Sequence, residues 1–374
     1  MSTERLYDTF SKLVSIDSPS SGERGVCDFL GAKLLTLGFD IFEDDTAQKI
    51  GGNSGNLYGF LQGDSGLEPI LLCAHMDTVE PSRKKISILH ENGTISSKGD
   101  TVLGADDLAG VAEILEAIQR LIESKEPRRP IEVLFTVAEE LYCRGARHFD
   151  TSILKSKEAF VFDLSGSVGR AATSAPSIIT FETVFKGKSA HAGFAFDKGV
   201  HAVAAACDAV LAIPMGQIDS DTTCNIGSIR GGGATNIIPH ECSITGEIRS
   251  FSHERALYWT NEIKKIIIQK TQKRGAECDF KSSEHIMAYK TSDNSPAALR
   301  FKRACDAVSL PCEFVKTFGG SDNNHLVSAG IDGLVVANAM YDCHSTREST
   351  RLQDMETVVN LIVNIIAINQ EDVA

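Results

Sequence analysis

The sequence lacks several features that would place it in common classes of protein. It has no run of about 18 apolar residues, so we expect no membrane-spanning helix. Its polar N-terminus, MSTERLYDTF, has no apolar signal region, so we do not expect secretion. None of the ten cysteines belongs to a C-x-x-C pair, which argues against a zinc knuckle or a disulfide framework. Reduced thiols of this kind predict a cytoplasmic protein.

The sequence also lacks an excess of basic residues. The formal net charge is −13, and the acidic residues are spread along the chain, which argues against a nucleic-acid partner. The glycine-rich stretch RGGGATN does not end in the Lys-Ser/Thr pair of a phosphate-binding loop. The negative charge suits a solvated surface, and it also suits carboxylates gathered around a cation.

The chain is long enough, at 374 residues, to predict two domains. In its first part short apolar strands alternate with amphipathic helices, which predicts an α/β domain with a mostly parallel sheet. Ser20 and Glu23 resemble a capping box at the start of one helix, and Asp106 and Asp107 begin another, DDLAGVAEILEAIQRLIES. The strands are expected at 39–43, 56–61, 70–74, 131–138 and 159–163.

The pattern changes in the middle of the chain. Residues 178–186 alternate between apolar and polar side chains, as a strand with one buried face does. The elements that follow predict the order βαββαβ, which is that of a ferredoxin-like α+β domain. We therefore predict an inserted domain at 177–285 within a discontinuous catalytic domain formed by 1–176 and 286–374.

Side chains able to bind metal follow several of the expected strands. Ligands in open α/β sheets bind at the carboxyl ends of strands, where these side chains would meet. Each one alone has a simpler explanation: a helix cap, a hydrogen-bonded core histidine, a solvent-facing glutamate or a turn residue. The residues are His75, Asp77, Asp106, Asp107, Glu139, Glu140, Asp163 and His344.

Taken together, they favour a pair of divalent cations. Glu139 and Glu140 follow a buried strand, where two like charges repel unless a positive charge compensates them. Histidines and carboxylates suit zinc, with cobalt or manganese as alternatives. Two such ions could share a bridging carboxylate and a bridging hydroxide. One glutamate would then ligate while the other acts as general base, and Asp77 could orient the imidazole of His75.

The motifs HMDTV, GADDLAG, AEEL, the pair Phe162-Asp163 and a late CHS resemble the di-zinc aminoacylase and carboxypeptidase-G-type peptidases, and most of all the peptidase T group. This resemblance covers nearly the whole chain. It implies a phosphorylase/hydrolase-like catalytic domain with an inserted lid. It also implies Glu139 as general base, Asp77 as supporting carboxylate, Asp106 as the bridging ligand, and as further metal ligands His75, Glu140, Asp163 and His344.

The same resemblance extends to the inserted domain. GKSAHAG is similar to a family segment whose histidine stabilises the transition state, here His191. GATNIIPHECSITGEIRS resembles the segment with substrate contacts, here Asn236 and Arg249. Without the resemblance, these would be read as a surface turn and an exposed strand. In relatives whose inserted domains dimerise, this histidine serves the neighbouring subunit. We therefore expect a homodimer in which His191 acts in this way, with a monomer whose lid closes as the alternative. Departures from the family, such as Gly319-Gly320-Ser321-Asp322-Asn323, concern substrate identity more than the metal site.

The expected function is hydrolysis of short peptides by a metal-bridged hydroxide, most of all as a tripeptide aminopeptidase. A carboxypeptidase, a dipeptidase and an N-acyl-amino-acid deacylase remain alternatives, because the same hydroxide would attack the same amide in each. A non-catalytic protein that binds amino-acid derivatives is an alternative of another class. Such a protein would be expected to lack the general base, whereas Glu139 is present.

Overall fold

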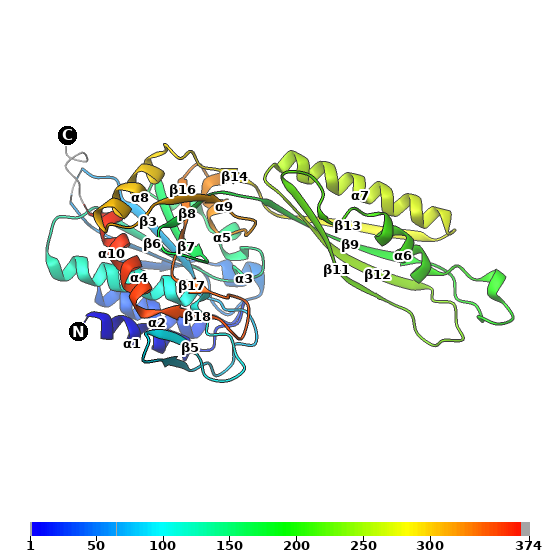
Figure 1. The fold of residues 1–374 in the computed structure, drawn as a ribbon, viewed down its shortest axis with the longest axis horizontal. Coiled ribbons are helices and arrows are strands. Elements are labelled where there is room, and N and C mark those ends of the chain that lie inside the picture. The colour runs from blue at the N-terminus through cyan, green and yellow to red at the C-terminus, as the bar shows by residue number, and fades with distance from the viewer. Residues whose placement is uncertain (1, 65, 368–374) are drawn as a thin grey trace. The chain divides into compact units, whose positions relative to one another are not determined.

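The strands that precede the reactive residues lie side by side at the centre of one large sheet (Figure 1). Strands β6, β3, β7 and β16 run parallel to one another, and β3 is buried along its whole length. A strand covered on both faces needs a continuous apolar run, and Ile70–Leu72 supplies it. The strand order is β1 (Asp40–Glu43), β2 (Leu57–Leu61), β6 (Ile131–Thr136), β3 (Ile70–His75), β7 (Glu158–Leu164), β16 (Asp332–Ala337), β8 (Arg170–Ala175) and β14 (Tyr289–Lys290), with β15 (Glu313–Lys316) beside β8.

Helix α4 (Ala105–Ser124) is the central helix of this part of the chain. It contacts β3 and β7 and packs against the helices at the two ends of the described chain, α1 (Ser2–Val14) and α10 (Leu352–Ile366). The remaining helices are α2 (Arg24–Thr36), α3 (Thr46–Ile50), α5 (Arg144–His148), α8 (Pro296–Ala307) and α9 (Asn323–Ser328), with a 3₁₀ turn at Thr151–Ile153. A small sheet is formed by β17 (Met340–Tyr341), β18 (Ser349–Arg351), β5 (Thr94–Ser97) and β4 (Ser87–Leu89).

The computed structural model describes residues 2–64 and 66–367, and the chain divides into two compact units. The second unit comprises Ala175–Tyr289 and Phe318–Gly320, and the first unit comprises the rest. The predicted insertion, 177–285, lies inside the second unit. The segment Phe318–Gly320, which the sequence placed in the catalytic part, clusters with the second unit instead.

The second unit is an antiparallel sheet with two helices. The alternation predicted for its first strand places Ile179, Phe181 and Phe185 in a separate apolar core beneath the helices. Sheet order and chain order together give the ferredoxin-like arrangement. The sheet order is β10 (Gly216–Gln217), β11 (Thr222–Gly231), β12 (Glu241–Ser250), β9 (Ser177–Lys186) and β13 (Glu277–Ile286), and the helices are α6 (Ala202–Ala212) and α7 (His253–Lys273), with a 3₁₀ turn at Phe196–Lys198.

The capping box predicted at Ser20 and Glu23 is wrong. A tight turn closed by the Gly22 N–H and the Pro19 carbonyl separates Ser20 from the helix. Helix α2 begins at Arg24, and Glu23 at its N-cap forms no capping hydrogen bond through its side chain. Both predicted capping side chains make tertiary contacts instead, and the Ser20 hydroxyl donates to Asp77 Oδ2 at 2.6 Å.

Two expectations from the sequence, that no helix spans a membrane and that the cysteines are reduced, can be compared with the described residues. Within 2–64 and 66–367, no helix is both long enough and apolar enough to cross a membrane. All ten cysteines lie in this part of the chain, and each is a free thiol.

Candidate metal centre

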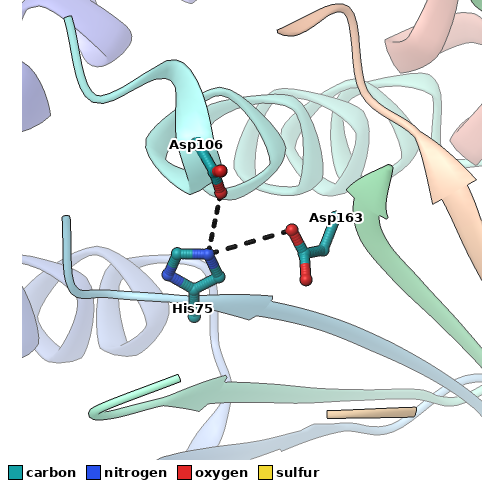
Figure 2. Close-up of side chains that lie close together, drawn as sticks. All are labelled: His75, Asp106 and Asp163. Atoms are coloured by element: carbon teal, nitrogen blue, oxygen red, sulfur yellow. Dashed lines mark hydrogen bonds and ion pairs between the residues drawn. The ribbon is translucent and has the colours of Figure 1, made fainter. Parts of the chain in front are cut away.

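Five of the side chains expected to bind metal form two groups that share one member. His75, Asp106 and Asp163 make the first group (Figure 2), and Asp106, Glu140 and His344 make the second. Within each group one donor atom from every residue lies within 4.8 Å of the others. Asp106 Oδ1 lies 3.0 Å from His75 Nε2, and Asp106 Oδ2 lies 3.2 Å from His344 Nε2. The Asp106 carboxylate thus has one oxygen in each group.

His75 is held with one ring nitrogen directed into the first group. Its Nδ1 lies 2.9 Å from the backbone carbonyl of Asp77, which can only accept a hydrogen bond. The proton of a neutral ring therefore sits on Nδ1, and the lone pair on Nε2 faces Asp106 and Asp163. A metal-ligating imidazole commonly donates its other ring N–H to a carbonyl or carboxylate in this way.

The second group is more open to solvent than the first. His344 follows β17, its side chain is 57% exposed, and its Nε2 lies 3.1 Å from Glu140 Oε1. By contrast His75 is only 1% exposed. The first group is therefore buried, whereas the second is open to solvent at His344.

The carboxylates of the centre need positive charge. Burial, followed by the repulsion of neighbouring carboxylates, raises the pKa values of Glu139 and Asp163 well above the usual range. Burial also raises the pKa of Glu140, although contact with His344 opposes the shift. Against the effect of burial, His344 and His75 hold the pKa of Asp106 well below its usual value. Divalent cations fit this donor set, because they would compensate the buried negative charge with nitrogen and oxygen ligands that zinc accepts.

Glu139 points to different partners from its neighbour Glu140. Its carboxylate belongs to neither histidine-containing group, and its Oε1 accepts the thiol proton of Cys143 at 3.1 Å. Glu139, Cys143 and Asp322 form a third buried cluster. Neither Cys143 nor Asp322 was predicted to lie at this centre: Cys143 was one of ten thiols, and Asp322 was noted only within a segment that departs from the family pattern.

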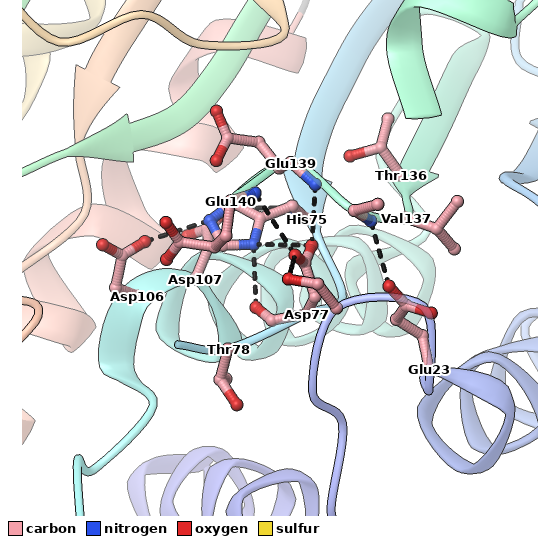
Figure 3. A network of polar contacts seen from close by, with 12 residues as sticks. Glu23, His75, Asp77, Thr78, Asp106, Asp107, Thr136, Val137, Glu139 and Glu140 are labelled. Carbon is pink, nitrogen blue, oxygen red and sulfur yellow. Dashed lines mark hydrogen bonds and ion pairs between the residues drawn. The ribbon is translucent and has the colours of Figure 1, made fainter. Parts of the chain in front are cut away.

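Asp77 holds the turn between β6 and α5 that carries both glutamates (Figure 3). Its Oδ1 accepts the backbone N–H of Glu139 at 3.0 Å, and its Oδ2 accepts that of Glu140 at 3.2 Å. The Asp77 carboxylate lies 3.5 Å from His75 Nδ1, farther than its own backbone carbonyl. The predicted support of His75 therefore comes first from the Asp77 backbone, while the carboxylate fixes the turn.

Two buried carboxylates outside the predicted ligand set support the start of α4. Asp107 was one of the candidate metal-binding side chains, with a helix cap as its simpler explanation, and it accepts the His75 backbone N–H at 3.0 Å and the Asn338 side-chain amide at 2.6 Å. Glu348 accepts the backbone N–H groups of Gly104 and Asp106, at 2.7 and 2.9 Å. These contacts hold Asp106 and Asp107 in the non-helical conformations that the structure shows.

The three residues predicted to contact substrate lie in the second unit. His191 forms an isolated β-bridge with Ile237, and the Asn236 carbonyl accepts the Ala192 N–H at 2.9 Å. Arg249 is already paired, because its guanidinium contacts both carboxylate oxygens of Glu247. A substrate carboxylate would have to compete with Glu247 for this arginine.

The chain is similar to peptidases along its length. Residues 56–222 match the description "Peptidase family M28", and residues 173–274 match "Peptidase dimerisation domain". The uncharacterized protein YqjE of Bacillus subtilis is 32% identical, over 97% of this chain and 98% of that one. The aminopeptidase PepT of Bacillus cereus superposes with a TM-score of 0.89 at 34% identity, over 97% and 98% of the two chains. A tripeptidase of Staphylococcus aureus superposes with a TM-score of 0.93 at 29% identity, over 97% of each chain.

Proposed function

The chain belongs to the peptidase T family of peptidases, and we propose that it removes the first residue from short peptides, tripeptides above all, at a centre of two divalent metal ions. The aminopeptidase and the tripeptidase to which it is similar support this direction and length of substrate. The observation that carries the metal centre is the Asp106 carboxylate, which offers one oxygen to each of two donor groups.

The metal ligands in this proposal are His75, Asp106, Glu140, Asp163 and His344, with Asp106 shared. Five side chains exceed the three protein ligands of an ordinary catalytic zinc site, but they suffice for two adjacent ions. Bound there, two zinc ions, or cobalt or manganese in their place, would acidify a water molecule and polarise the scissile carbonyl.

Glu139 acts as the general base and then as the general acid. Its carboxylate is outside both donor groups, so it is free to take a proton from the attacking water and to pass it to the leaving amine. The raised pKa of Glu139, which comes first from burial, suits a group that must both accept and release a proton. His191, Asn236 and Arg249 are proposed to contact the substrate.

We further propose that the chain forms a homodimer through the second unit, since residues 173–274 match a peptidase dimerisation domain. The ten free thiols support a cytoplasmic location.

The metal content of the purified protein tests the centre. We expect two ions per chain at full loading, loss of activity with a chelator, and recovery when zinc, cobalt or manganese is added. Full activity with a single ion per chain would contradict the two-ion centre.

The substrate is tested by incubating the loaded protein with a mixed library of di-, tri- and tetrapeptides and identifying the products by mass spectrometry. Products that lack the first residue support an aminopeptidase. Products that lack the last residue would overturn that assignment in favour of a carboxypeptidase.

A further inference from the structure

Glu23 is a buried carboxylate at the start of α2 that takes no part in capping that helix. Its side chain is fully buried, and Oε1 accepts the backbone N–H of Ser21 at 2.7 Å and that of Ala138 at 3.0 Å. Ala138 is the residue immediately before Glu139. Figure 3 shows the Glu23 carboxylate directed at the turn that Glu139 and Glu140 occupy.

The contact with Ala138 completes a set of four. The backbone N–H groups of residues 137 to 140 are all bound by side chains from distant segments. Asn56 accepts the N–H of Val137 at 3.1 Å, Glu23 accepts the next one, and Asp77 accepts those of the two glutamates. The four N–H groups therefore donate to side chains and not to the backbone of a neighbouring strand. The direction of both glutamates depends on the side chains of Asn56, Glu23 and Asp77.

The segment that carries Glu23 is attached to the same part of the site. The Thr78 N–H donates to the Ser18 carbonyl at 2.9 Å, and the Ser20 hydroxyl donates to Asp77 Oδ2. A serine or aspartate at the surface could cap α2 without being buried. Burying the Glu23 carboxylate close to the charge of Asp77 is electrostatically unfavourable, so the capping of α2 does not explain why a buried glutamate stands at this position.

We propose that Glu23 is a positioning residue that fixes the turn carrying the general base and a metal ligand. The proposal rests on the function proposed for Glu139 and Glu140. Loss of the Glu23 acceptor would free the Ala138 N–H and let both glutamates turn away from the reacting groups, without removing any group that contacts substrate.

The test compares Glu23→Ala, Glu23→Asp and Glu23→Gln. The side chain at position 23 must be long enough to reach the N–H groups of Ser21 and Ala138. We therefore expect activity to fall in the order wild type, Glu23→Gln, Glu23→Asp and Glu23→Ala. In Glu23→Ala we expect kcat to fall about 10- to 100-fold with KM little changed, and metal affinity, measured by chelator competition, to fall in the same range. Glu23→Gln should recover most of both quantities, because its amide oxygen can accept the same hydrogen bonds.

Glu132 provides a matched control. It is also fully buried and accepts two backbone N–H groups, from Lys155 and Ser156, but it lies at the opposite end of β6. Glu132→Ala should lower the melting temperature and leave kcat and metal affinity of the folded protein unchanged.

Two results would overturn the proposal. One is kcat and metal affinity within about twofold of wild type in Glu23→Ala or, if that variant does not fold, in Glu23→Asp, whose side chain is too short to reach both N–H groups. The other is an equal loss in Glu132→Ala. Neither result depends on whether Glu139→Gln is inactive, so failure of this inference is distinguishable from failure of the proposed function.

Discussion

Glu139 and Glu140 are neighbours in the sequence with different surroundings. Glu140 faces His344 on the more exposed side of the centre, whereas Glu139 is buried and contacts Cys143. The same turn directs the two carboxylates to different partners because Asp77 binds both of their backbone N–H groups. This arrangement suits the proposed roles of Glu139 as general base and Glu140 as metal ligand.

This division predicts different results for the two amide substitutions. Glu139→Gln should retain both metal ions and lose turnover by about 10²- to 10⁴-fold, because the amide cannot accept the proton of water. Glu140→Gln should lose metal affinity as well. Both quantities are measured on protein dialysed against buffered zinc. An active Glu139→Gln enzyme, or one that loses its metal, would mean that the two roles are exchanged.

The ends of parallel strands made most candidate ligands predictable from the sequence. His75 and Asp163 lie at the ends of the parallel strands β3 and β7, as the rule about the sheet edge predicts. His344 was expected directly after a strand at 333–340, but β16 ends at Ala337 and His344 instead follows β17, an antiparallel strand of the small sheet. Their supporting residues could not be predicted in this way. Glu348 binds the backbone of Gly104, which is 244 residues away in the sequence. Nothing in the polar stretch around Glu348 marks it as buried, because its burial depends on that distant contact.

At the scale of elements, helix α4 carries a proposed metal ligand in its first turn and a buried carboxylate farther along. Its first turn carries Asp106, and Glu113 lies deeper in the helix, fully buried. Neither carboxylate oxygen of Glu113 has a hydrogen-bond partner among the described residues. Burial first, and then the charges of Asp107 and Asp354, raise the pKa of Glu113 well above its usual value.

This shift makes stability depend on pH. Above the ordinary pKa of glutamate, about 4.3, the unfolded chain releases the Glu113 proton while the folded chain keeps it. The folded state then binds more protons, so the free energy of unfolding falls as pH rises, by at most about 1.4 kcal/mol per pH unit. Glu113→Gln should remove the contribution that Glu113 makes to this slope. Compared with wild type, the variant should gain stability between pH 5 and pH 8 in urea unfolding of the metal-free protein.

Glu116 on the same helix is the control. Its carboxylate is paired with Arg5 and Arg120, so Glu116→Gln should destabilise the protein at neutral pH. A difference between Glu113→Gln and wild type that does not change with pH would show that the Glu113 carboxyl does not titrate between the folded and unfolded states.

The sequence predicted the strand β9 correctly but predicted the wrong cap for the helix α2. The alternation in β9 was reliable because one face of the strand is buried and the other is not. The pattern at Ser20 and Glu23 misled because it is local, whereas the hydrogen-bond partners of these side chains, Asp77 and Ala138, lie more than 50 residues away. A local pattern predicts a cap only where tertiary contacts do not compete for the same side chains.

At the scale of the whole molecule, the second unit exposes apolar side chains that suit the homodimer proposed above. Phe194 is 82% exposed and stacks on the His191 ring, with centroids 3.7 Å apart. Ile237, which bridges to His191, is 47% exposed. Apolar groups left in water in this way gain by being covered by a second copy, in agreement with the match of this region to a dimerisation domain.

The hydrogen bonding of His191 suits a role in stabilising negative charge. Its Nδ1 accepts the Gly193 N–H at 3.1 Å, so the neutral ring carries its proton on Nε2. An Nε2–H group aimed at the oxyanion of the tetrahedral intermediate would bind more strongly as charge develops. In a dimer built through the second unit, we expect His191 to serve the active site of the partner subunit.

Mixing two inactive variants tests this arrangement. Glu139→Gln and His191→Ala are unfolded together, refolded, and compared with each variant refolded alone. If His191 acts in the partner's site, every mixed dimer has one site with both substitutions and one site with neither, so each mixed dimer should recover about half the activity of a wild-type dimer. If His191 acts within its own chain, every site retains one substitution and the mixture stays inactive. Native mass spectrometry counts the mixed dimers, and their presence without recovered activity would exclude the action of His191 across the dimer.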